Sequence, residues 1–422
     1  MRPGTTHRVS TPSDFDPFSP ETIADPYPFY EALRRDAPVY PLERTGYSLV
    51  SRYDDCREIA LAPDRYSSNL VAIVFAQSGA DPELMSIGGD GPRPVDVLAI
   101  ADEPDHARQR KLSNKAFSRS RVVDLAPSVN ELADRLLDPI LESGTTEWMD
   151  AFANEMPTQL MCRLIGLPLD DRTQLRTWAN DGSALLSGVL DTDQLVERGR
   201  SVNELVRYLA ARFDEARGAP SDDVLGDFVR ATGNDSECLT DDEVVSILLQ
   251  LLSAGTESTA ALLGNAIRLL AADDELQALL RERPGFIGRF VEEAVRVESP
   301  FQGHFRVANE DTTIAGTPVA AGTRLMLLWG SANRDEREFE RPERIDVHRT
   351  NLNMHLGFGF GIHHCIGAGL ARLEARVAIE RLLERTRWVR LASELPAPYV
   401  RSVMIRRLER LEIEAEPVDS TS

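Results

Sequence analysis

The stretch Phe358-Gly359-Phe360-Gly361-Ile362-His363-His364-Cys365-Ile366-Gly367 decides how the rest of the chain is interpreted. Its three glycines allow the backbone to turn sharply and to lie close to a flat ligand. An apolar segment, residues 369–383, follows directly and is predicted to be a helix. N–H groups at the start of that helix would stabilise negative charge on Cys365. A thiolate held in this way suits a soft metal, and a haem iron fits well.

Three other interpretations of this stretch can be weighed on its residues. Gly357, Gly359 and Gly361 suggest a dinucleotide-binding turn, but Ile362 or His364 stands where GxGxxG requires its last glycine. A zinc site is conceivable, yet the paired spacings of structural zinc are missing from its candidate ligands, His355, His363, His364 and Cys365. A buried free thiol is the usual explanation for an isolated cysteine. Further motifs in the chain argue against it.

The stretch resembles the cysteine loop of the cytochrome P-450 superfamily, whose pattern is Phe-x-x-Gly-x-(Arg/His)-x-Cys-x-Gly. The chain fills this pattern with Phe358, Gly361, His363, Cys365 and Gly367. The resemblance covers residues 14–415, so it implies one domain, with irregular termini at 1–13 and 416–422. The implied fold is mainly α with small β-sheets (α+β), a triangular-prism helical domain that encloses haem b. The resemblance makes Cys365 the axial iron ligand and assigns Phe358, His363 and Gly367 to haem binding.

The composition is that of an ordinary globular protein, with 42% apolar and 27% charged residues among 422. No run of eighteen apolar residues occurs, and the start of the chain is polar and proline-rich, so we expect a soluble, cytoplasmic protein. The cysteines lie far apart and form no disulfide pattern; they are Cys56, Cys162, Cys238 and Cys365.

The net charge of −21 argues against nucleic acid and anionic membranes as partners. Both lysines of the chain, Lys111 and Lys115, nevertheless lie in one short basic segment with Arg108, Arg110 and Arg119. This segment predicts a docking patch for an acidic partner, the alternative being a solvated helix face. The resemblance implies a separate ferredoxin with its NAD(P)H-dependent reductase, because no flavin or iron–sulfur domain is fused. It also implies a monomer, and it places electron entry near Lys111, Lys115, Arg372 and Arg376.

Residues 67–98 show no periodicity after a short apolar piece and are predicted to be a long loop. Such a loop in a compact chain is usually a lid, a binding loop or a linker. The resemblance makes it the cover of the substrate pocket, with Leu70, Ala72 and Phe75 as apolar contacts. The next segment places His106 and Arg110 four residues apart, on one face of a helix. Both can donate to a haem propionate, and the resemblance assigns the same role to Arg306.

A long buried helix is predicted from the capping box of Thr240 and Glu243 to about Ala272. One face of this helix has Ile247, Leu251, Ala254 and Ser258 at helical spacing. Small Ala254 and Gly255 are expected to leave room for a ligand. Ser258 is expected to bond back to the carbonyl of residue 254.

Glu257 is an acid in this apolar helix and needs partners or a shifted pKa. Glu257 and Ser258 resemble the acid–alcohol pair with which the family delivers protons to bound dioxygen, and Ala254 and Gly255 complete that motif. The chain departs from the family by having Ser258 where threonine is usual. Serine lacks the methyl group that restricts the rotamer, so we expect proton delivery with more peroxide lost. The alternative is a helix kink with a structural acid.

Glu293 and Arg296 are three residues apart on one helix face and can pair. They resemble the family's structural motif, which locks onto a later arginine, here Arg344 or Arg349. The resemblance also places Phe301, His304 and Met404 at the substrate pocket, where His304 could hold one polar group.

The function implied is a haem-thiolate monooxygenase that inserts one oxygen atom from O2 into an apolar small organic molecule, with electrons from a ferredoxin. Two alternatives of other classes are a peroxygenase, which peroxide-driven turnover would reveal, and a non-catalytic haem or ligand binder, which would form no product. The Glu257–Ser258 pair favours dioxygen activation over both.

Overall fold

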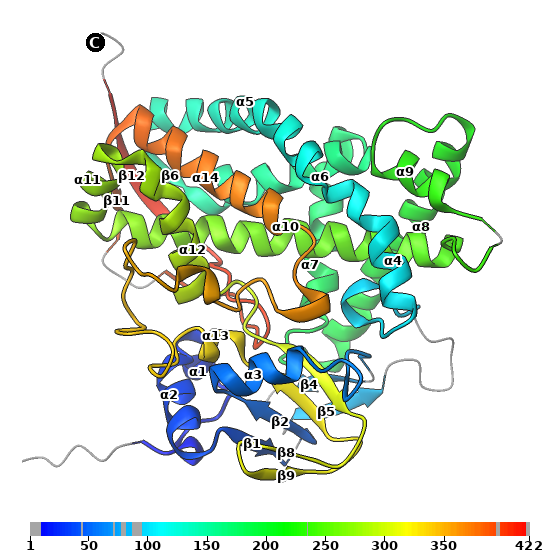
Figure 1. Cartoon of the computed structure of the whole chain (residues 1–422). Helices are drawn as coiled ribbons and strands as arrows, with labels where there is room; N and C mark the ends of the chain where they lie inside the picture. Colours follow the sequence, from blue (N-terminus) through cyan, green and yellow to red (C-terminus); the bar gives the residue numbers. More distant parts are fainter. Residues whose placement is uncertain are drawn as a thin grey trace, which may run out of the picture.

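The computed structural model describes residues 10–43, 45–70, 72–76, 82–86, 95–233, 235–393 and 397–418. The chain forms a large helical part and, beside it, a smaller part built on a β-sheet (Figure 1). The prediction of a mainly α fold with small sheets is confirmed.

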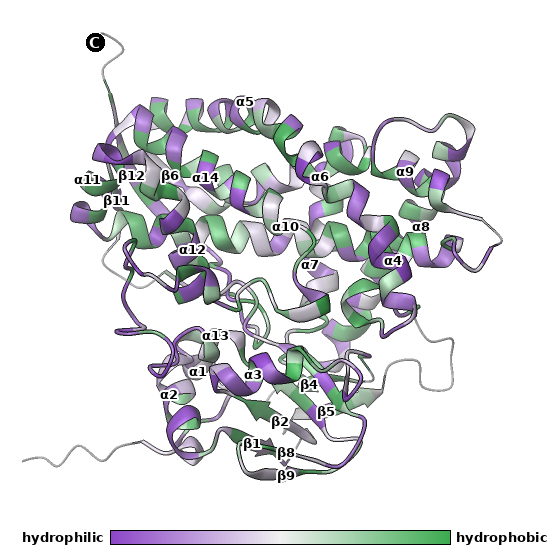
Figure 2. Ribbon diagram, in the orientation of Figure 1, coloured by the Kyte–Doolittle hydropathy of each residue, from purple (hydrophilic) through white to green (hydrophobic). Residues whose placement is uncertain are grey.

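Helix α10 (Asp241–Ala271) runs through the helical part and is the longest element of the fold (Figure 1). The predicted capping box forms, because Thr240 and Glu243 exchange side-chain and backbone hydrogen bonds. Hydrophobic residues cover much of α10 (Figure 2), and most of them are buried. Within the described residues α10 alone is long and apolar enough to cross a membrane, with 56% of its most apolar window buried. A core helix of a soluble protein has the same properties.

Other helices surround α10. A π-helical turn (Met149–Ala153) directly precedes α6 (Glu155–Ile165). The helices that pack directly on α10 include α6, α7, α8, α11, α12 and α14. The other bounds are α4 (Asp105–Ser113), α5 (Arg119–Ser143), α7 (Arg172–Ala184), α8 (Thr192–Gly218), α9 (Val224–Ala231), α11 (Asp274–Glu282), α12 (Ile287–Val297) and α14 (Ala368–Arg385).

The main sheet joins strands from the two ends of the chain in the order β1-β2-β10-β7-β3. Its centre is the parallel pairing of β2 with β10, in which Tyr47 lies opposite Arg324. The short helices on this side are α1 (Pro20–Ala24), α2 (Tyr27–Asp36), α3 (Tyr53–Ala60) and α13 (Trp329–Ala332). The strands are β1 (Val39–Leu42), β2 (Tyr47–Val50), β3 (Tyr66–Ser67), β7 (His304–Ala308) and β10 (Arg324–Leu327).

The prediction of an unstructured loop over residues 67–98 is wrong in its middle. Strands β4 (Ala72–Ala76) and β5 (Pro82–Ser86) pair there as an antiparallel ribbon. The apolar residues of β4 pack against the segment between α7 and α8, and this packing is a tertiary contact that sequence periodicity does not report. Two further small sheets have the orders β11-β12-β6 and β8-β9. Their strands are β6 (Thr145–Glu147), β8 (Thr312–Ile314), β9 (Thr317–Val319), β11 (Thr386–Leu391) and β12 (Glu412–Pro417).

Candidate functional site

The cysteine loop is shaped by glycines in backbone conformations that other residues rarely adopt. Gly359 has φ of 69° and Gly361 has φ of 71°, both in the left-handed region. A Cβ atom on Gly361 would lie 2.3 Å from the carbonyl oxygen of Ala60, at the end of α3. The turn is closed by the Cys365 N–H, which donates to the Phe358 carbonyl at 2.8 Å. Helix α14 then begins at Ala368, as the sequence predicted to within one residue.

Cys365 is exposed, whereas Cys56 and Cys162 are buried. Desolvation by the surrounding atoms raises the pKa of the Cys365 thiol, and the backbone N–H groups of Gly367 and Ala368 oppose that rise. Exposure together with desolvation indicates that the sulfur lies in a recess and not on a convex surface. N–H donors at a helix start are the arrangement that stabilises a thiolate ligand.

A group of basic side chains lies beside the loop. The rings of His106, from α4, and His363 are 4.4 Å apart between centroids. Nε2 of His363 is 2.8 Å from the Ser68 hydroxyl. Its buried Nδ1 makes no well-formed hydrogen bond among the described residues, although the Leu98 carbonyl lies near enough to favour protonation. Burial, followed by nearby Arg306, lowers the pKa of His363 to about 3.

Arg306 is 5% exposed, and burial lowers its pKa to about 10. Its Nη1 donates only to the Phe305 carbonyl among the described residues, so the guanidinium retains capacity for an anion. Arg110 is half-buried, bonds to Asn114 at 3.1 Å, and is electrostatically coupled to Cys365. A soft sulfur donor beside buried donors with capacity for carboxylates fits a haem, which carries two propionates.

Helix α10 exposes part of one face in its middle. Ala254 is exposed although most of the helix is buried. One turn later the Ser258 hydroxyl donates to the Ala254 carbonyl at 2.5 Å, as predicted from the sequence. The adjacent Gly255 has a different role from the one expected. A Cβ atom there would lie 2.9 Å from the Met161 sulfur, so Gly255 allows α6 to pack closely and does not leave room for a ligand.

Glu257 is 5% exposed and contacts Arg407, with 3.3 Å between Oε1 and Nε. Burial raises the pKa of Glu257, and Arg407 and Ser183 oppose that rise. The second carboxyl oxygen has no hydrogen-bond partner in the described part of the chain. Sequence reasoning missed Arg407. The need of a buried acid for a cation was a signal, but nothing in the sequence selects one arginine among so many.

The residues predicted to contact substrate lie in several different parts of the structure. Ile247 is fully buried and Leu251 is 6% exposed in the helical core. Leu70 and Phe75 pack with the segment between α7 and α8. The carbonyl of Ala72 accepts a hydrogen bond from the Tyr47 hydroxyl. Phe301, His304 and Met404 lie together near the sheet, since the Phe301 and His304 rings are 5.3 Å apart and Met404 packs in the cluster that includes Phe301.

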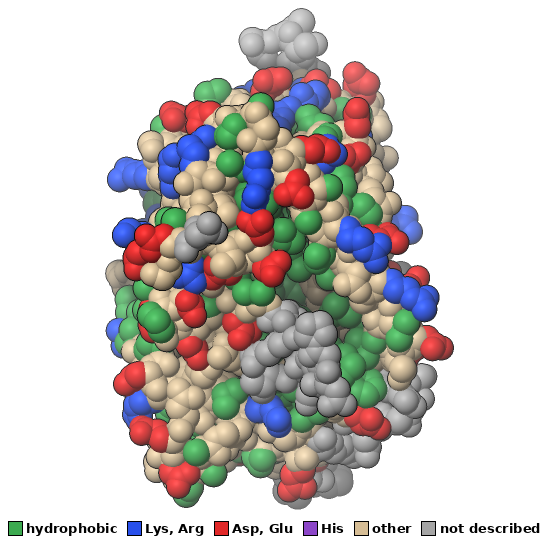
Figure 3. Space-filling view, turned by 90° about the vertical axis from the view of Figure 1, so that its right-hand side faces the viewer, with side chains coloured by type: hydrophobic (Ala, Val, Ile, Leu, Met, Phe, Trp, Pro, Cys, Tyr) green, Lys and Arg blue, Asp and Glu red, His purple; other side chains and the backbone are tan. Residues whose placement is uncertain are grey.

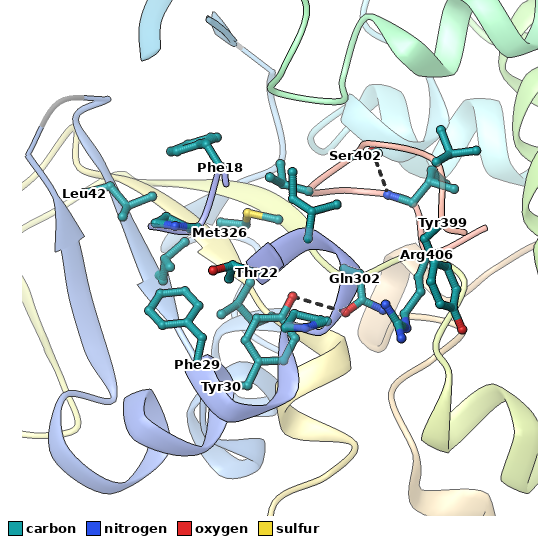
Figure 4. A pocket seen from close by; sticks show the side chains of 18 residues that line it. Phe18, Thr22, Phe29, Tyr30, Leu42, Gln302, Met326, Tyr399, Ser402 and Arg406 are labelled. Carbon is teal, nitrogen blue, oxygen red and sulfur yellow. Dashed lines mark hydrogen bonds between the residues drawn. The ribbon is translucent and has the colours of Figure 1, made fainter. Parts of the chain in front are cut away.

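Two small cavities adjoin the main sheet, with volumes of about 50 and 30 Å³. The larger is lined mostly by hydrophobic side chains, Phe29, Leu42 and Met326 among them (Figure 4). Val403, next to Met404, lines both cavities. On the surface seen in Figure 3, hydrophobic side chains gather around a central hollow, with charged side chains scattered farther out. The molecule therefore has apolar recesses on the side of the sheet.

Glu293 and Arg296 form a fully buried pair with both side chains at 0% exposure. Of the two later arginines considered, Arg349 contacts Glu293 at 3.2 Å. Arg344 supplies only its carbonyl, to Arg296 at 2.8 Å. The motif thus joins α12 to the segment that precedes the cysteine loop.

The predicted docking residues differ in their partners. Lys111 is exposed, whereas Lys115 pairs with Asp227 at 2.7 Å. Arg372 makes two hydrogen bonds with Glu292, at 2.6 and 2.9 Å. Arg376 is exposed and pairs with Glu380. The structure describes no cluster of three or more His, Cys, Asp or Glu residues that could hold a metal, so the zinc alternative has no support within the described ranges.

Comparison with known proteins agrees with these features. The family model described as Cytochrome P-450 matches residues 286–407. The Mycobacterium tuberculosis protein named cytochrome P-450 144 is 38% identical over 400 residues, which cover 94% of this chain and 90% of that protein. The vitamin D(3) 25-hydroxylase of Pseudonocardia autotrophica is 33% identical, with 95% and 96% covered. A crystal structure of a P-450 with an acyl carrier protein bearing hexadec-9Z-enoic acid has a TM-score of 0.85 and 30% identity, covering 94% of this chain and 99% of that chain.

The chain belongs to the cytochrome P-450 superfamily. It is a P-450 monooxygenase of bacterial type with the fold of that family, so the family assignment and the enzyme class predicted from the cysteine loop are confirmed. Membership implies a haem-thiolate cofactor and the use of dioxygen and a redox partner.

Proposed function

We propose that this protein is a cytoplasmic, single-domain monooxygenase that binds haem b and oxidises an apolar small molecule with electrons from a ferredoxin. The observation that supports it most is the exposed Cys365, whose sulfur faces N–H donors at the start of α14 beside the donors His363 and Arg306. The reduced, carbon-monoxide-bound spectrum tests it. A Soret band at the long wavelength of thiolate-ligated haem supports the proposal, and a spectrum of histidine ligation refutes it.

In this proposal each residue has one role. Cys365 would hold the haem iron through its thiolate, and Phe358 and Gly367 would contact the haem. Its propionates would be held by His106, Arg110, Arg306 and His363. A bound haem would supply the redox chemistry with dioxygen, and the Cys365 thiolate would donate electron density to its iron. Ser258 presents a hydroxyl at the opening of α10 beside Ala254. Glu257 lies next to it in the chain and supplies protons through water, because burial keeps its pKa raised.

The substrate is proposed to be apolar because the side chains proposed to contact it, Leu70, Phe75 and Phe301 among them, pack in hydrophobic clusters. Relatives named vitamin D(3) 25-hydroxylase and 6-deoxyerythronolide B hydroxylase agree with a hydrophobic substrate class. Leu70, Phe75, Leu251, Ala254 and Phe301 remain the proposed contacts. Contact with Ala72, Ile247 or Met404 requires these side chains to move, since each is at most 2% exposed.

Glu257→Gln is expected to lower the rate of product formation by at least about tenfold and to raise the peroxide released per electron pair. The amide cannot supply the proton, and general acid–base groups contribute about 10²–10⁴-fold. Product and peroxide are measured with a surrogate ferredoxin system and a substrate found by spin-state shift. Glu197→Gln, an exposed carboxyl on α8, is the control and should leave both quantities unchanged. Unchanged coupling in Glu257→Gln would exclude Glu257 as the proton source.

Lys111→Glu is expected to slow reduction by ferredoxin about tenfold at low salt, with a smaller difference at high salt, because surface charge mainly affects association rates. Stopped-flow reduction of the carbon monoxide complex measures this effect. Arg390→Glu is the matched control, since it reverses an exposed charge on β11, far from α4 in Figure 1. If both variants slow reduction equally, the effect is one of net charge, and docking near Lys111, Lys115, Arg372 and Arg376 is wrong.

A further inference from the structure

His304 shares a face of the main sheet with Arg306. The two residues are separated by one position on β7, so their side chains point to the same side. Their partners on β10, Leu327 and Leu325, belong to the buried cluster against which Phe360 of the cysteine loop packs. Phe305, between them, points to the other side and lines the smaller cavity. His304 therefore faces the basic group at the cysteine loop, and the smaller cavity lies across the sheet.

Trp329 fixes the tautomer of His304. Its indole nitrogen lies 2.7 Å from Nδ1 of His304. An indole N–H can only donate, so Nδ1 must accept and the ring hydrogen must lie on Nε2. Trp329 is 1% exposed and begins helix α13, and this burial holds the donor in place. Burial and nearby Arg306 lower the pKa of His304 to about 4, so the ring stays neutral near pH 7.

Among the described residues, the side chain of His304 makes one hydrogen bond, the one with Trp329. Its Nε2–H therefore has no acceptor there. Its charged neighbour Arg306 and its neighbour His363 are donors as well. Asp102, the acid that acts on Arg306, is already bound by Ser67 and Ser68. Arg306 is buried, and His304 and His363 are partly buried. Donors in such surroundings, without a carboxylate of their own, are complementary to a ligand that brings one.

We propose that His304 is a haem-positioning residue whose Nε2–H, set by Trp329, donates to a haem carboxylate beside Arg306. The inference rests on the proposed function, since it requires haem at the cysteine loop. It moves His304 from the substrate contacts predicted from the sequence to the cofactor. The His304–Trp329 pair then adds a neutral, directional donor to the charged one that Arg306 provides.

Haem release from the holoenzyme tests this role without any substrate. Purified variants are mixed with excess apomyoglobin, and transfer of haem is followed by absorbance. His304→Ala is expected to lose haem roughly ten- to a hundredfold faster, the effect of removing a hydrogen bond to a charged group. His304→Gln, which keeps a donor, should recover most of the difference. Phe305→Leu, on the same strand but the other face, is the matched control and should release haem at the wild-type rate.

The carbon monoxide spectrum of each variant is recorded first. A wild-type spectrum without the thiolate band would refute the proposed function itself. With that band present, three results would overturn the role of His304 alone: haem release from His304→Ala at the control rate, failure of His304→Gln to slow it, or a change confined to substrate binding. The expected order of haem release is Ala, then Gln, then wild type.

Discussion

Cys365→Ser is expected to lose the long-wavelength Soret band of the reduced carbon monoxide complex and to have no measurable monooxygenase turnover. The serine hydroxyl is a harder and far weaker donor than a thiolate, and the N–H groups of Gly367 and Ala368 cannot make it an anion near pH 7. Absorption spectra and product analysis, made on protein of equal haem content, measure the two effects.

Cys238→Ser is the matched control for this variant. Cys238 is a free cysteine outside the loop, so its replacement should leave both the band and the turnover as they are in the wild type. If Cys365→Ser kept the thiolate band, another residue would have to be the ligand. Loss of the band in Cys238→Ser as well would point to general damage instead of ligation.

Arg296→Ala is expected to lower the free energy of unfolding by about 3–5 kcal/mol, the cost of breaking a fully buried ion pair. The change leaves Glu293, within the described part of the chain, with Arg349 as its one remaining cationic partner. It also removes donors from the carbonyls of Asn333, Pro342 and Arg344. Urea unfolding followed by tryptophan fluorescence measures the effect.

Arg376→Ala, which breaks an exposed pair with Glu380, is the control and should cost no more than about 1 kcal/mol. If Arg296→Ala cannot be purified, Arg349→Lys serves in its place, because it keeps the charge and loses the forked donor. Its expected loss lies between those of the other two variants. A loss from Arg296→Ala as small as that from Arg376→Ala would contradict a structural role for this motif.

The features that the sequence predicted correctly depend on short stretches of chain. The capping box at Thr240 and the hydrogen bond from Ser258 to the Ala254 carbonyl involve residues three or four apart. The local sequence is therefore sufficient to predict them. The glycines of the cysteine loop likewise report a local backbone shape. The pairing of Glu293 with Arg296 was readable for the same reason.

Contacts between distant segments could not be read in this way. The parallel pairing of β2 with β10 joins two ends of the chain, and neither strand carries a signal for the other. The β4–β5 ribbon, the contact of Glu257 with Arg407 and the packing of Met161 on Gly255 are of the same kind. Each of these contacts forms because the folded chain brings the two segments together. From the sequence alone, many other partners were equally plausible.

The closure of the cysteine loop has a consequence for cofactor uptake. Its turn is held by protein atoms alone, through the hydrogen bond from Cys365 to the Phe358 carbonyl and the contact of Gly361 with Ala60. Helix α12 is tied, through Glu293 and Arg349, to the segment that precedes the cysteine loop. An incoming haem therefore meets a preorganised ligand, and little conformational entropy remains to be lost on that side.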